Sequence, residues 1–414
     1  MKYVKYLRCT SCNQTFPATP CQLLCPACKT GTLDVLYDYD SLKKKVTKEY
    51  FAKESTQSIW RYLPLLPVRD VDTIETLAVG MTPLYQANQL KKIVKMDNLY
   101  VKDDGLNPTL SLKDRASVVA ICKAREAQNK VICCASTGNA ASSLAGNAAK
   151  AGLKSIIFVP KRAPVGKLVQ LALFGALVIK VDGDYKDAFD LSSQVIDRYG
   201  FYNRNAAINP YLVEGKKTVA YEISEQLGFE PIDWVVVSVG DGCTIAGVYK
   251  GFYDLYKLGL IPAIPRLLGV QADGCKPLMD AAITGQLVIA KENTIADSIA
   301  VGEPRNHHKA LLAVKESQGE WISASDSEIL SAMRLLGSAE GVFSEPAAAC
   351  SVAGLIKARN QGIINRSDKT VVISTGNGLK DQQTAAKAAD EPVLLENSIQ
   401  AFINYYEKIN KERK

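Results

Sequence analysis

One lysine of the sequence lies where its amine could act as a nucleophile. Lys113 ends the polar segment Asn107-Pro-Thr-Leu-Ser-Leu-Lys113 and directly precedes a helical pattern over residues 114–128, with Ser111 as the candidate N-cap. The positive end of a helix dipole and burial both disfavour the protonated form of a lysine. Both effects favour the free amine that imine formation requires. Most lysines are solvated surface charges, so the neighbouring segments decide the interpretation.

Three further polar segments contain glycine and follow apolar runs that predict strands. They are Ser136-Thr-Gly-Asn139, Val239-Gly-Asp-Gly-Cys-Thr-Ile-Ala-Gly247 and Ser374-Thr-Gly-Asn-Gly-Leu-Lys-Asp381. Ligands of open α/β sheets collect at such strand ends, and amide groups at the start of a helix suit a carboxylate or a phosphate. An ordinary strand-to-helix turn has the same composition and is the alternative for each segment taken alone.

The segment over residues 239–247 predicts a phosphate site. Gly240 and Gly242 permit a tight nest of backbone N–H groups around an anion. The dinucleotide fingerprint is missing because Ile245 stands where its last glycine should be, and the G-K-[ST] sequence of a P-loop is missing too. We therefore expect a phosphate-sized anion rather than a dinucleotide or a nucleoside triphosphate.

Two C-x-x-C pairs have the spacing of a structural zinc site. Cys9 and Cys12 are separated by twelve residues from Cys25 and Cys28. Four thiolates can close a tetrahedral Zn²⁺ site, and the metal would replace the core that so short a segment lacks. Because four protein ligands leave no open position, we expect the ribbon over residues 1–40 to be structural. A set of free thiols is the alternative, and Cys21 is a spare cysteine.

The rest of the chain has the pattern of an α/β fold. Apolar runs predict strands at residues 131–134, 156–159, 177–181, 234–237, 267–270 and 371–374, and helical patterns alternate with them at 114–128, 140–150, 167–174, 185–199, 218–227 and 245–258. This alternation favours mainly parallel sheets with helices on both faces. Residues 41–80 predict a partly helical connector. Residues 391–414 contain a helical period of apolar side chains, so we expect them to dock as an amphipathic helix.

Composition and charge exclude several classes of protein. Of the 414 residues, 47% are hydrophobic and 22% charged, and the net charge of +7 is dispersed rather than gathered into a nucleic-acid footprint. We expect no membrane span and no secretory signal, and therefore a cytoplasmic protein. His307 and His308 are adjacent in a segment that reads as a loop, which disfavours a two-histidine metal site. No G-x-S-x-G elbow supports a serine hydrolase.

Together these segments resemble threonine synthase, in the β-family of pyridoxal-phosphate enzymes with the tryptophan synthase β-subunit fold (fold-type II). The resemblance runs from about residue 5 to 390. Besides the ribbon and the Lys113 segment, it rests on Ala135-Ser-Thr-Gly-Asn139, Asn209-Pro, Glu214-Gly-Lys-Lys-Thr218, Gly341-Val-Phe-Ser-Glu-Pro346 and Thr375-Gly-Asn-Gly-Leu-Lys-Asp381. It implies a homodimer with a catalytic region over residues 81–390, whose smaller subdomain would span residues 114–215.

The resemblance also implies roles for individual residues. Lys113 would be the Schiff-base lysine and the proton shuttle. Asn139 would hydrogen-bond the ring hydroxyl of the cofactor, and Thr375 would face its pyridine nitrogen. The cofactor phosphate would be bound by main-chain N–H groups of Gly240, Asp241, Gly242, Cys243 and Thr244. The substrate carboxylate would lie against Ser136, Thr137 and Gly138.

The implied reaction converts O-phosphohomoserine and water to threonine and phosphate by γ-elimination and β-hydration. The chain departs from the family pattern where the leaving phosphate is commonly held by a threonine, an Asn-Ser pair and an arginine. The residues at those positions are Ala140, Ala206, Ala207 and Leu212. Leu110 also stands where the lysine motif commonly has glycine.

Several functions remain open from the sequence. Loss of a bidentate guanidinium from a phosphate site costs on the order of a few kcal/mol, so a phosphate substrate would need other cations, such as Arg204, Lys216 or Arg305. A threonine or serine dehydratase, or a β- or γ-replacement enzyme, would need no such cation. The ribbon and the Thr375 segment favour threonine synthase. A third hypothesis is a binding protein rather than an enzyme, in which a zinc ribbon binds nucleic acid and the α/β portion is catalytically inert. Few basic and aromatic residues lie near the ribbon, which disfavours contact with a phosphate backbone.

Overall fold

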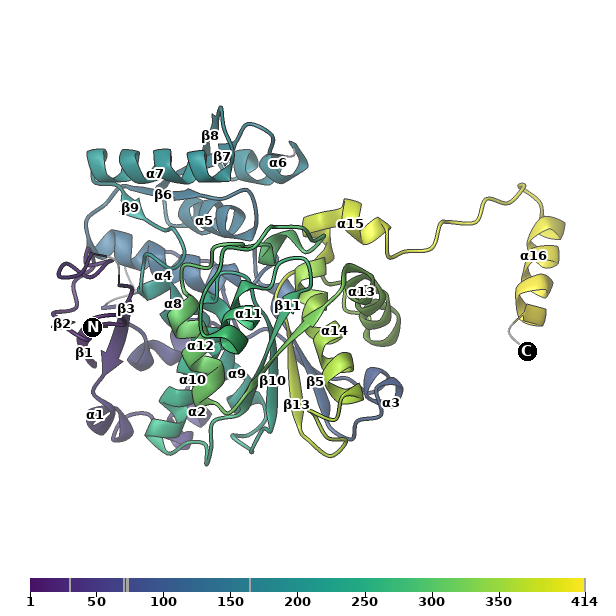
Figure 1. The fold of residues 1–414 in the computed structure, drawn as a ribbon, viewed down its shortest axis with the longest axis horizontal. Coiled ribbons are helices and arrows are strands. Elements are labelled where there is room, and N and C mark those ends of the chain that lie inside the picture. Colours follow the sequence, from purple (N-terminus) through teal and green to yellow (C-terminus); the bar gives the residue numbers. More distant parts are fainter. Residues whose placement is uncertain (30, 70, 72–73, 164, 413–414) are drawn as a thin grey trace.

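A six-stranded sheet lies at the centre of the computed structural model, which describes residues 1–29, 31–69, 71, 74–163 and 165–412 (Figure 1). The strand order is β12-β11-β10-β13-β5-β4, and all neighbours are parallel except the edge pair β4–β5. The strands are Glu320–Ala324 (β12), Arg266–Ala272 (β11), Trp234–Ser238 (β10), Thr370–Ser374 (β13), Leu99–Asp103 (β5) and Leu84–Gln86 (β4).

The central strands are apolar along their whole length because both faces of this sheet are covered. In β10, Val235 and Val237 belong to one hydrophobic core, whereas Val236 belongs to another. Successive side chains of a strand point to opposite faces, so the two cores lie on opposite sides. The first core includes residues of α9 (Thr218–Gln226), α10 (Cys243–Leu258) and α12 (His307–Glu316). The second includes residues of α13 (Asp326–Glu340) and α14 (Pro346–Asn360).

A second, four-stranded parallel sheet lies above the first in the view of Figure 1. Its order is β8-β7-β6-β9, with strands Leu177–Val181 (β8), Lys154–Pro160 (β7), Val131–Ala135 (β6) and Tyr202–Asn203 (β9). One face packs against α4 (Lys113–Glu126), α5 (Asn139–Lys150) and α6 (Val165–Leu173), and the other against α7 (Tyr185–Tyr199). Apart from Lys113 at the start of α4, this region falls within residues 114–215, and the boundaries of the subdomain stay a prediction.

The structure confirms each predicted strand and helix of the α/β region to within two residues at either end. It corrects two local predictions. Ser111 is not the N-cap of α4, since Leu112 holds that position without a side-chain bond and the main chain of Ser111 pairs with Gly376 instead. His307 and His308 lie in the first turn of α12 rather than in a loop, with ring centroids 4.1 Å apart.

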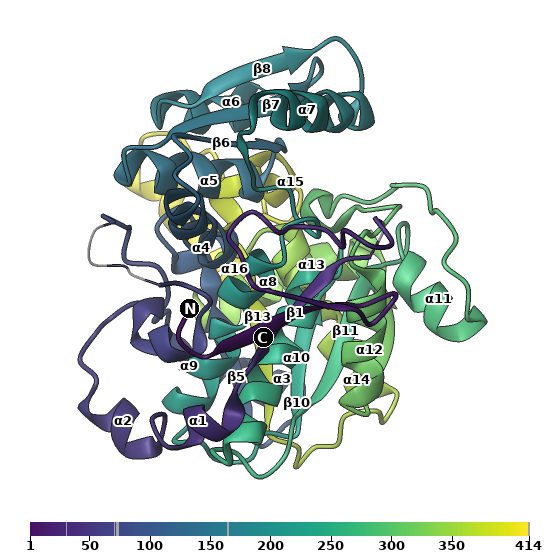
Figure 2. The ribbon, with the colours of Figure 1, turned by 90° about the vertical axis from the view of Figure 1, so that its left-hand side faces the viewer.

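The N-terminal ribbon is a three-stranded antiparallel sheet that packs against the body (Figure 2). Its order is β2-β1-β3, with strands Thr15–Phe16 (β2), Val4–Cys9 (β1) and Leu33–Tyr37 (β3). Leu7 and Val35 join the first core, and Asp34 forms a 2.6 Å ion pair with Lys309 of α12. The connector that follows contains α1 (Tyr39–Lys43), α2 (Lys48–Lys53) and the 3-10 helix η1 (Ile59–Leu65).

Other helices complete the body. They are α3 (Leu90–Ile93), α8 (Tyr211–Lys216), α11 (Pro277–Thr284) and α15 (Gln382–Ala386), with the 3-10 helices η2 (Asp104–Leu106), η3 (Asp297–Ile299) and η4 (Gly378–Asp381). Within the described ranges, no helix combines the length and apolarity that crossing a bilayer would need.

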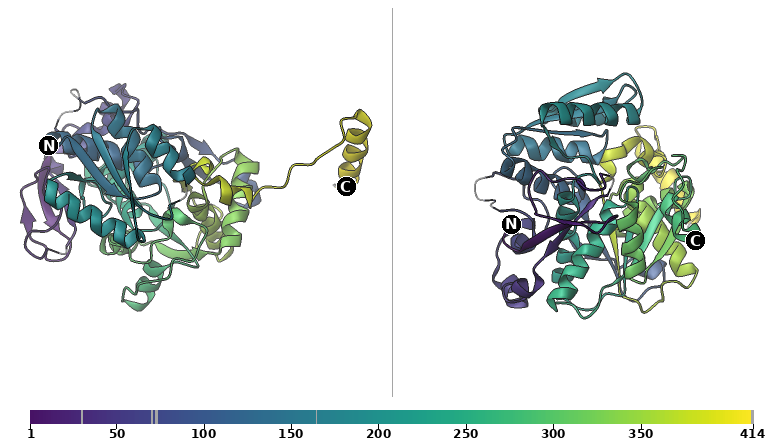
Figure 3. Two further views of the ribbon diagram at one scale, coloured as in Figure 1. Left: turned by 90° about the horizontal axis from the view of Figure 1, so that it is seen from above. Right: turned by 60° about the vertical axis from the view of Figure 1, so that its left-hand side comes forward.

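The C-terminal helix α16 (Ile399–Glu412) stands apart from the body at the end of an extended linker (Figure 3). Its apolar side chains face solvent; Phe402 is 50% exposed and Tyr406 52% exposed. The prediction that this segment docks was therefore wrong with respect to its own chain, although the helix itself is present.

Candidate active site

A cavity of about 400 Å³ brings together all the catalytic, cofactor and substrate residues that the sequence predicts. It opens where strands of both parallel sheets end: Ser136 follows β6, Val239 follows β10 and Thr375 follows β13. The predicted residues in its wall are Lys113, Ser136, Thr137, Gly138, Asn139, Gly240, Asp241, Gly242, Cys243, Thr244 and Thr375. Their convergence follows from topology, because the carboxyl ends of parallel strands meet at one edge of a sheet.

Lys113 is the first residue of α4, and the segment before it is fixed to the end of β13. The N–H of Leu112 donates to the carbonyl oxygen of Thr375 at 2.9 Å, and the N–H of Asn377 donates to that of Leu110 at 3.1 Å. Burial, reinforced by the positive charge of Lys216, lowers the pKa of the Lys113 amine to about 8. Nζ has no hydrogen-bond partner in the part of the chain that the structure describes, so the amine is available to a ligand.

The loop between β10 and α10 is built for close approach by an anion. Gly242 has φ +85°, and a Cβ there would lie 2.7 Å from Cβ of Ala310. A Cβ at Gly240 would lie 2.8 Å from Cα of Ile299, so a side chain fits at neither position. Asp241 fixes the loop, since its Oδ1 accepts the N–H of Arg305 at 2.8 Å. The first N–H groups of α10 have no acceptor within the helix, and the residues that carry them, Cys243 and Thr244, line the cavity.

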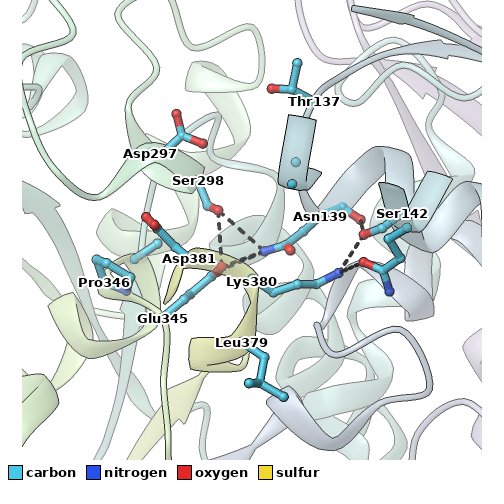
Figure 4. Close-up of a pocket in the computed structure, with 14 residues that line it drawn as sticks. Thr137, Asn139, Ser142, Asp297, Ser298, Glu345, Pro346, Leu379, Lys380 and Asp381 are labelled. Carbon is cyan, nitrogen blue, oxygen red and sulfur yellow. Dashed lines mark hydrogen bonds between the residues drawn. The ribbon is translucent and has the colours of Figure 1, made fainter. Parts of the chain in front are cut away.

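Asn139 begins α5 on the facing wall, and its amide is held by a buried carboxylate (Figure 4). Nδ2 of Asn139 donates to Oε1 and Oε2 of Glu345 at 2.9 and 3.0 Å. Because an ionised carboxylate only accepts hydrogen bonds, it fixes which end of the amide faces it. Gly376 leaves the space for this contact, since a Cβ there would lie 2.5 Å from Oε1 of Glu345.

Glu345 is a site residue that sequence reasoning missed, because the Glu-Pro-Ala-Ala-Ala run predicts only the start of α14. It lies in the cavity wall, and burial raises the pKa of its carboxyl group, against the opposing effects of Asn139, Lys113 and Lys380. The available signal was a lone carboxylate placed directly before a proline at the first position of an apolar helix.

A smaller cavity adjoins this wall and contains Lys380 (Figure 4). Nζ of Lys380 donates to Oγ of Ser142 and to Oε1 of Gln170, both at 2.8 Å. Burial lowers the pKa of this lysine to about 8. Its hydrogen bonds connect η4 to α5 and α6 beside the main cavity.

The three cations considered for a phosphate substrate all line the main cavity. Arg204 and Lys216 are buried, whereas Arg305 is half-buried and stacks over the ring of Phe189 at 4.1 Å. Of the positions that depart from the family pattern, Ala140 and Ala206 line the same cavity. The other two, Ala207 and Leu212, are buried outside its wall.

Comparison with known proteins gives the family. Residues 75–376 match the family model described as pyridoxal-phosphate dependent enzyme. The threonine synthase of Methanocaldococcus jannaschii is 40% identical over 409 residues, covering 98% of this chain and 99% of that protein. The threonine synthase of Methanosarcina acetivorans is 39% identical over 402 residues, covering 96% and 97%. The chain belongs to the pyridoxal-phosphate-dependent enzymes, in the threonine synthase family.

Solved structures agree with this family in fold. Threonine deaminase isoform 2 from Solanum lycopersicum superposes with a TM-score of 0.67 at 20% identity, covering 80% of this chain and 88% of that one. Maize serine racemase superposes with a TM-score of 0.62 at 21% identity, covering 81% and 94%. The predicted fold-type II architecture is confirmed.

The cofactor of this family, pyridoxal phosphate, matches the residues of the cavity. A half-buried amine with a lowered pKa lies in the same cavity as a glycine loop at a helix N-terminus, which suits an aldehyde at one end of the ligand and a phosphate at the other. Thr375 offers a neutral hydroxyl from the third strand end. The predicted roles of the individual residues stay predictions.

The four cysteines of the ribbon form a cluster whose geometry fits a bound metal ion. Their Sγ atoms all lie within 4.8 Å of one another, with Cys9–Cys28 and Cys12–Cys25 separations of 3.6 Å. Tetrahedral zinc with Zn–S bonds of about 2.3 Å places sulfurs about 3.8 Å apart. Backbone N–H groups of Cys12 and Cys28 point at Sγ of Cys9 and Cys25, as suits thiolate acceptors. Cys21 is exposed and lies outside the cluster.

Proposed function

We propose that this enzyme is a threonine synthase, which converts O-phosphohomoserine and water to threonine and phosphate. The observation that carries the proposal is one cavity that joins the Lys113 amine, a glycine loop for the cofactor phosphate and buried cations for a second phosphate, in a chain about 40% identical to threonine synthases.

Lys113 is the proposed base. When bound, pyridoxal phosphate supplies the electron-withdrawing ring that stabilises negative charge on the substrate carbons. The Lys113 amine, with a pKa of about 8, can take up the α proton and then a β proton near neutral pH and return a proton to the γ carbon after phosphate leaves. The other abstracted proton leaves with the phosphate as hydrogen phosphate. Water then supplies a hydroxyl group to the β carbon and a proton to the α carbon, which balances the overall reaction.

The remaining residues bind and orient. We assign the cofactor phosphate to the main-chain N–H groups of residues 240–244 and the substrate carboxylate to residues 136–138. Asn139 is assigned to the ring hydroxyl, since it lies in the cavity wall with its amide held in place by Glu345 and, at 3.4 Å, by Oγ of Ser298. Thr375 is assigned to the pyridine nitrogen, where a hydroxyl favours ring protonation less strongly than a carboxylate would.

A dehydratase or a β- or γ-replacement enzyme is the second candidate. It is favoured by the small apolar residues Ala140 and Ala206 in the cavity wall, which offer no bond to a phosphate. The two candidates differ in their products. A threonine synthase releases threonine and inorganic phosphate from O-phosphohomoserine, whereas a threonine dehydratase releases ammonia and a 2-oxo acid from threonine.

A panel of small amino acids with product analysis tests the proposal. We expect threonine and phosphate from O-phosphohomoserine, and none with Lys113→Ala. Borohydride reduction of the holoenzyme followed by peptide mapping should place the cofactor on Lys113. Intact cofactor binding without turnover of O-phosphohomoserine would contradict the threonine synthase assignment.

We further propose a structural zinc ion in the ribbon, a cytoplasmic location and a homodimer. The clustered thiols support the zinc ion. The chain has eleven cysteines, four of which cluster as a metal site requires, and this usage of cysteine is typical of a reducing compartment. The exposed apolar side chains of α16 favour association with a second copy of the chain.

A further inference from the structure

Two buried cations have no ion-pair partner among the residues that the structure describes. Buried arginines and lysines are rarely tolerated unless paired. In the described part of the chain, six of the eight buried side chains of this kind follow that rule. The paired ones are Arg61, Lys102, Arg115, Lys123, Lys217 and Lys309. Arg204, 1% exposed, and Lys216, 2% exposed, form no ion pair with any residue that the structure describes. Both line the main cavity, so an anionic ligand can supply the missing partner.

Arg204 is fixed in place by hydroxyl groups of α4 and α5. Its Nε and Nη2 donate to Oγ of Ser117 at 3.1 and 2.9 Å, and Oγ of Ser117 is 2.7 Å from Oγ of Ser143. These bonds hold the guanidinium plane while Nη1 has no acceptor among the described residues. A guanidinium held on one edge by a neutral hydroxyl keeps its full charge and donors for an anion.

The backbone places Arg204 beside the segment assigned to the substrate carboxylate. The N–H of Arg204 donates to the carbonyl oxygen of Cys133 at 2.9 Å, and the N–H of Ala135 donates to Oδ1 of Asn205 at 2.8 Å. Ser136 follows directly in the chain. Ala206, two residues after Arg204, lines the same wall and leaves space there.

Lys216 lies beside the glycine loop and α10. Its Cβ is 2.9 Å from the Cβ that would be present at Gly247, in the second turn of α10. Burial lowers the pKa of its amine, and the titratable groups that act on it are Cys243, Arg204 and Asp241, so the two cations lie near one another. By its backbone, Lys216 therefore lies against α10 and the glycine loop, whereas Arg204 lies beside the end of β6.

We propose that Arg204 binds the leaving phosphate of the substrate, while Lys216 supports the cofactor phosphate. This assignment rests on the proposed function and specifies how a chain with Ala140, Ala206 and Leu212 at the usual phosphate positions holds a phosphorylated substrate. Arg204 thus supplies a phosphate ligand from a position of the chain that differs from the usual ones. Ser117 holds the Arg204 guanidinium in place and is its positioning residue.

Titration of the holoenzyme with inorganic phosphate tests the proposal without requiring turnover. With saturating pyridoxal phosphate, calorimetry should detect phosphate binding to the parent protein, and Arg204→Met should weaken it about tenfold or more. Arg204→Lys should retain part of the affinity, and Ser117→Ala should lose a smaller part because the charge remains. The matched control is Arg198→Met, since Arg198 is an exposed arginine on α7 outside the cavity.

Kinetics supply the second readout. With O-phosphohomoserine, Arg204→Met should raise KM about tenfold or more, while Lys216→Met should lower affinity for pyridoxal phosphate and leave phosphate binding to the loaded enzyme unchanged. Phosphate affinity that is unchanged in Arg204→Met, or undetectable in the parent protein, would overturn the assignment. If Arg204→Met does not fold, unchanged affinity in Ser117→Ala overturns it. Phosphate binding that depends on Arg204 without turnover of O-phosphohomoserine would instead overturn only the proposed function.

Discussion

The protonation state of the Lys113 amine gives a prediction that can be tested by varying the pH. Burial and the charge of Lys216 lower its pKa from 10.5 to about 8, so the amine is mainly neutral above about pH 8. Only the neutral amine attacks an aldehyde. The rate at which the apoenzyme captures pyridoxal should therefore increase with pH along a titration curve whose midpoint is near pH 8. Stopped-flow absorbance measures this rate.

Two variants control that experiment. Lys113→Ala should capture no pyridoxal, and Lys216→Met should move the midpoint upward because a neighbouring positive charge is removed. Pyridoxal lacks the phosphate, so loss of the Lys216 charge does not also remove a phosphate ligand. A midpoint near 10.5 in the parent protein would mean that burial does not act on this amine.

Leu110 gives a second residue-scale prediction, from backbone conformation. It has φ +69°, in the left-handed region that costs a side-chain-bearing residue about 1–2 kcal/mol. We therefore expect Leu110→Gly to be more stable than Leu110→Ala by about 1 kcal/mol, the reverse of the usual order, in which glycine is less stable. Differential scanning calorimetry of the apoenzymes should give the higher Tm for Leu110→Gly. The same pair at Leu191, within α7, should show the usual order.

At the residue scale, sequence reasoning found the parts of the site that local chemistry marks. Lys113 before a helix and Gly240 and Gly242 after a strand are local signals, and the structure brings them together. Glu345 was missed because its contact with Asn139 joins residues 206 positions apart. The candidate N-cap Ser111 was wrong because its main chain pairs with Gly376, a long-range contact that no propensity encodes.

At the scale of elements, prediction succeeded for strands that are mostly apolar and missed β4, β5, β9 and β12. Val131–Ala135 and Trp234–Ser238 are covered on both faces, so hydrophobic residues are continuous along them. Residues 99–103 include Lys102, whose charge hides the strand in the sequence. The structure buries Lys102 in a 2.8 Å ion pair with Glu222, which also pairs with Arg115 of α4.

This buried network yields a prediction for the elements it joins. Glu222→Gln would leave the charges of Lys102 and Arg115 partly uncompensated between β5, α4 and α9, and breaking a buried pair costs about 3–5 kcal/mol. Thermal unfolding should show a large fall in Tm. Glu75→Gln is the control, because the Glu75–Lys150 pair is exposed and worth about 1 kcal/mol or less. Equal losses in the two variants would contradict a special role for the network.

The ribbon is the element whose stability should depend on metal. Its strands are short and its four clustered thiols stand where a core would be, so we expect one zinc ion per chain by elemental analysis. Cys25→Ser should lose the zinc and lower the Tm. Cys21→Ser should change neither, since Cys21 lies outside the cluster. The zinc assignment would be refuted if the purified parent protein contained no zinc and still unfolded at the same Tm as Cys21→Ser.

At the scale of the whole molecule, the C-terminal segment shows what periodicity can and cannot predict. The pattern of Ile399, Phe402, Ile403 and Tyr406 correctly predicted a helix with an apolar face. It did not predict the partner of that face, because amphipathicity specifies a buried side without specifying what buries it. In the structure the face of α16 contacts solvent, and Leu394 in the linker is 96% exposed.

Such a face, connected by a linker that holds it away from its own body, favours a second copy of the chain as its partner. We expect the full-length protein to be a dimer by light scattering coupled to size exclusion, and removal of residues 391–414 to shift it toward monomer, because apolar burial is the main driving force for association. Phe402→Glu with Tyr406→Glu should have the same effect without shortening the chain, while Gln400→Glu with Asn404→Glu, which changes two exposed polar residues of the same helix, should not. A truncated protein that keeps the mass of the full-length one would show that α16 does not hold the dimer together. Cofactor content should stay constant across these variants, because the cavity is formed entirely by residues 113–375.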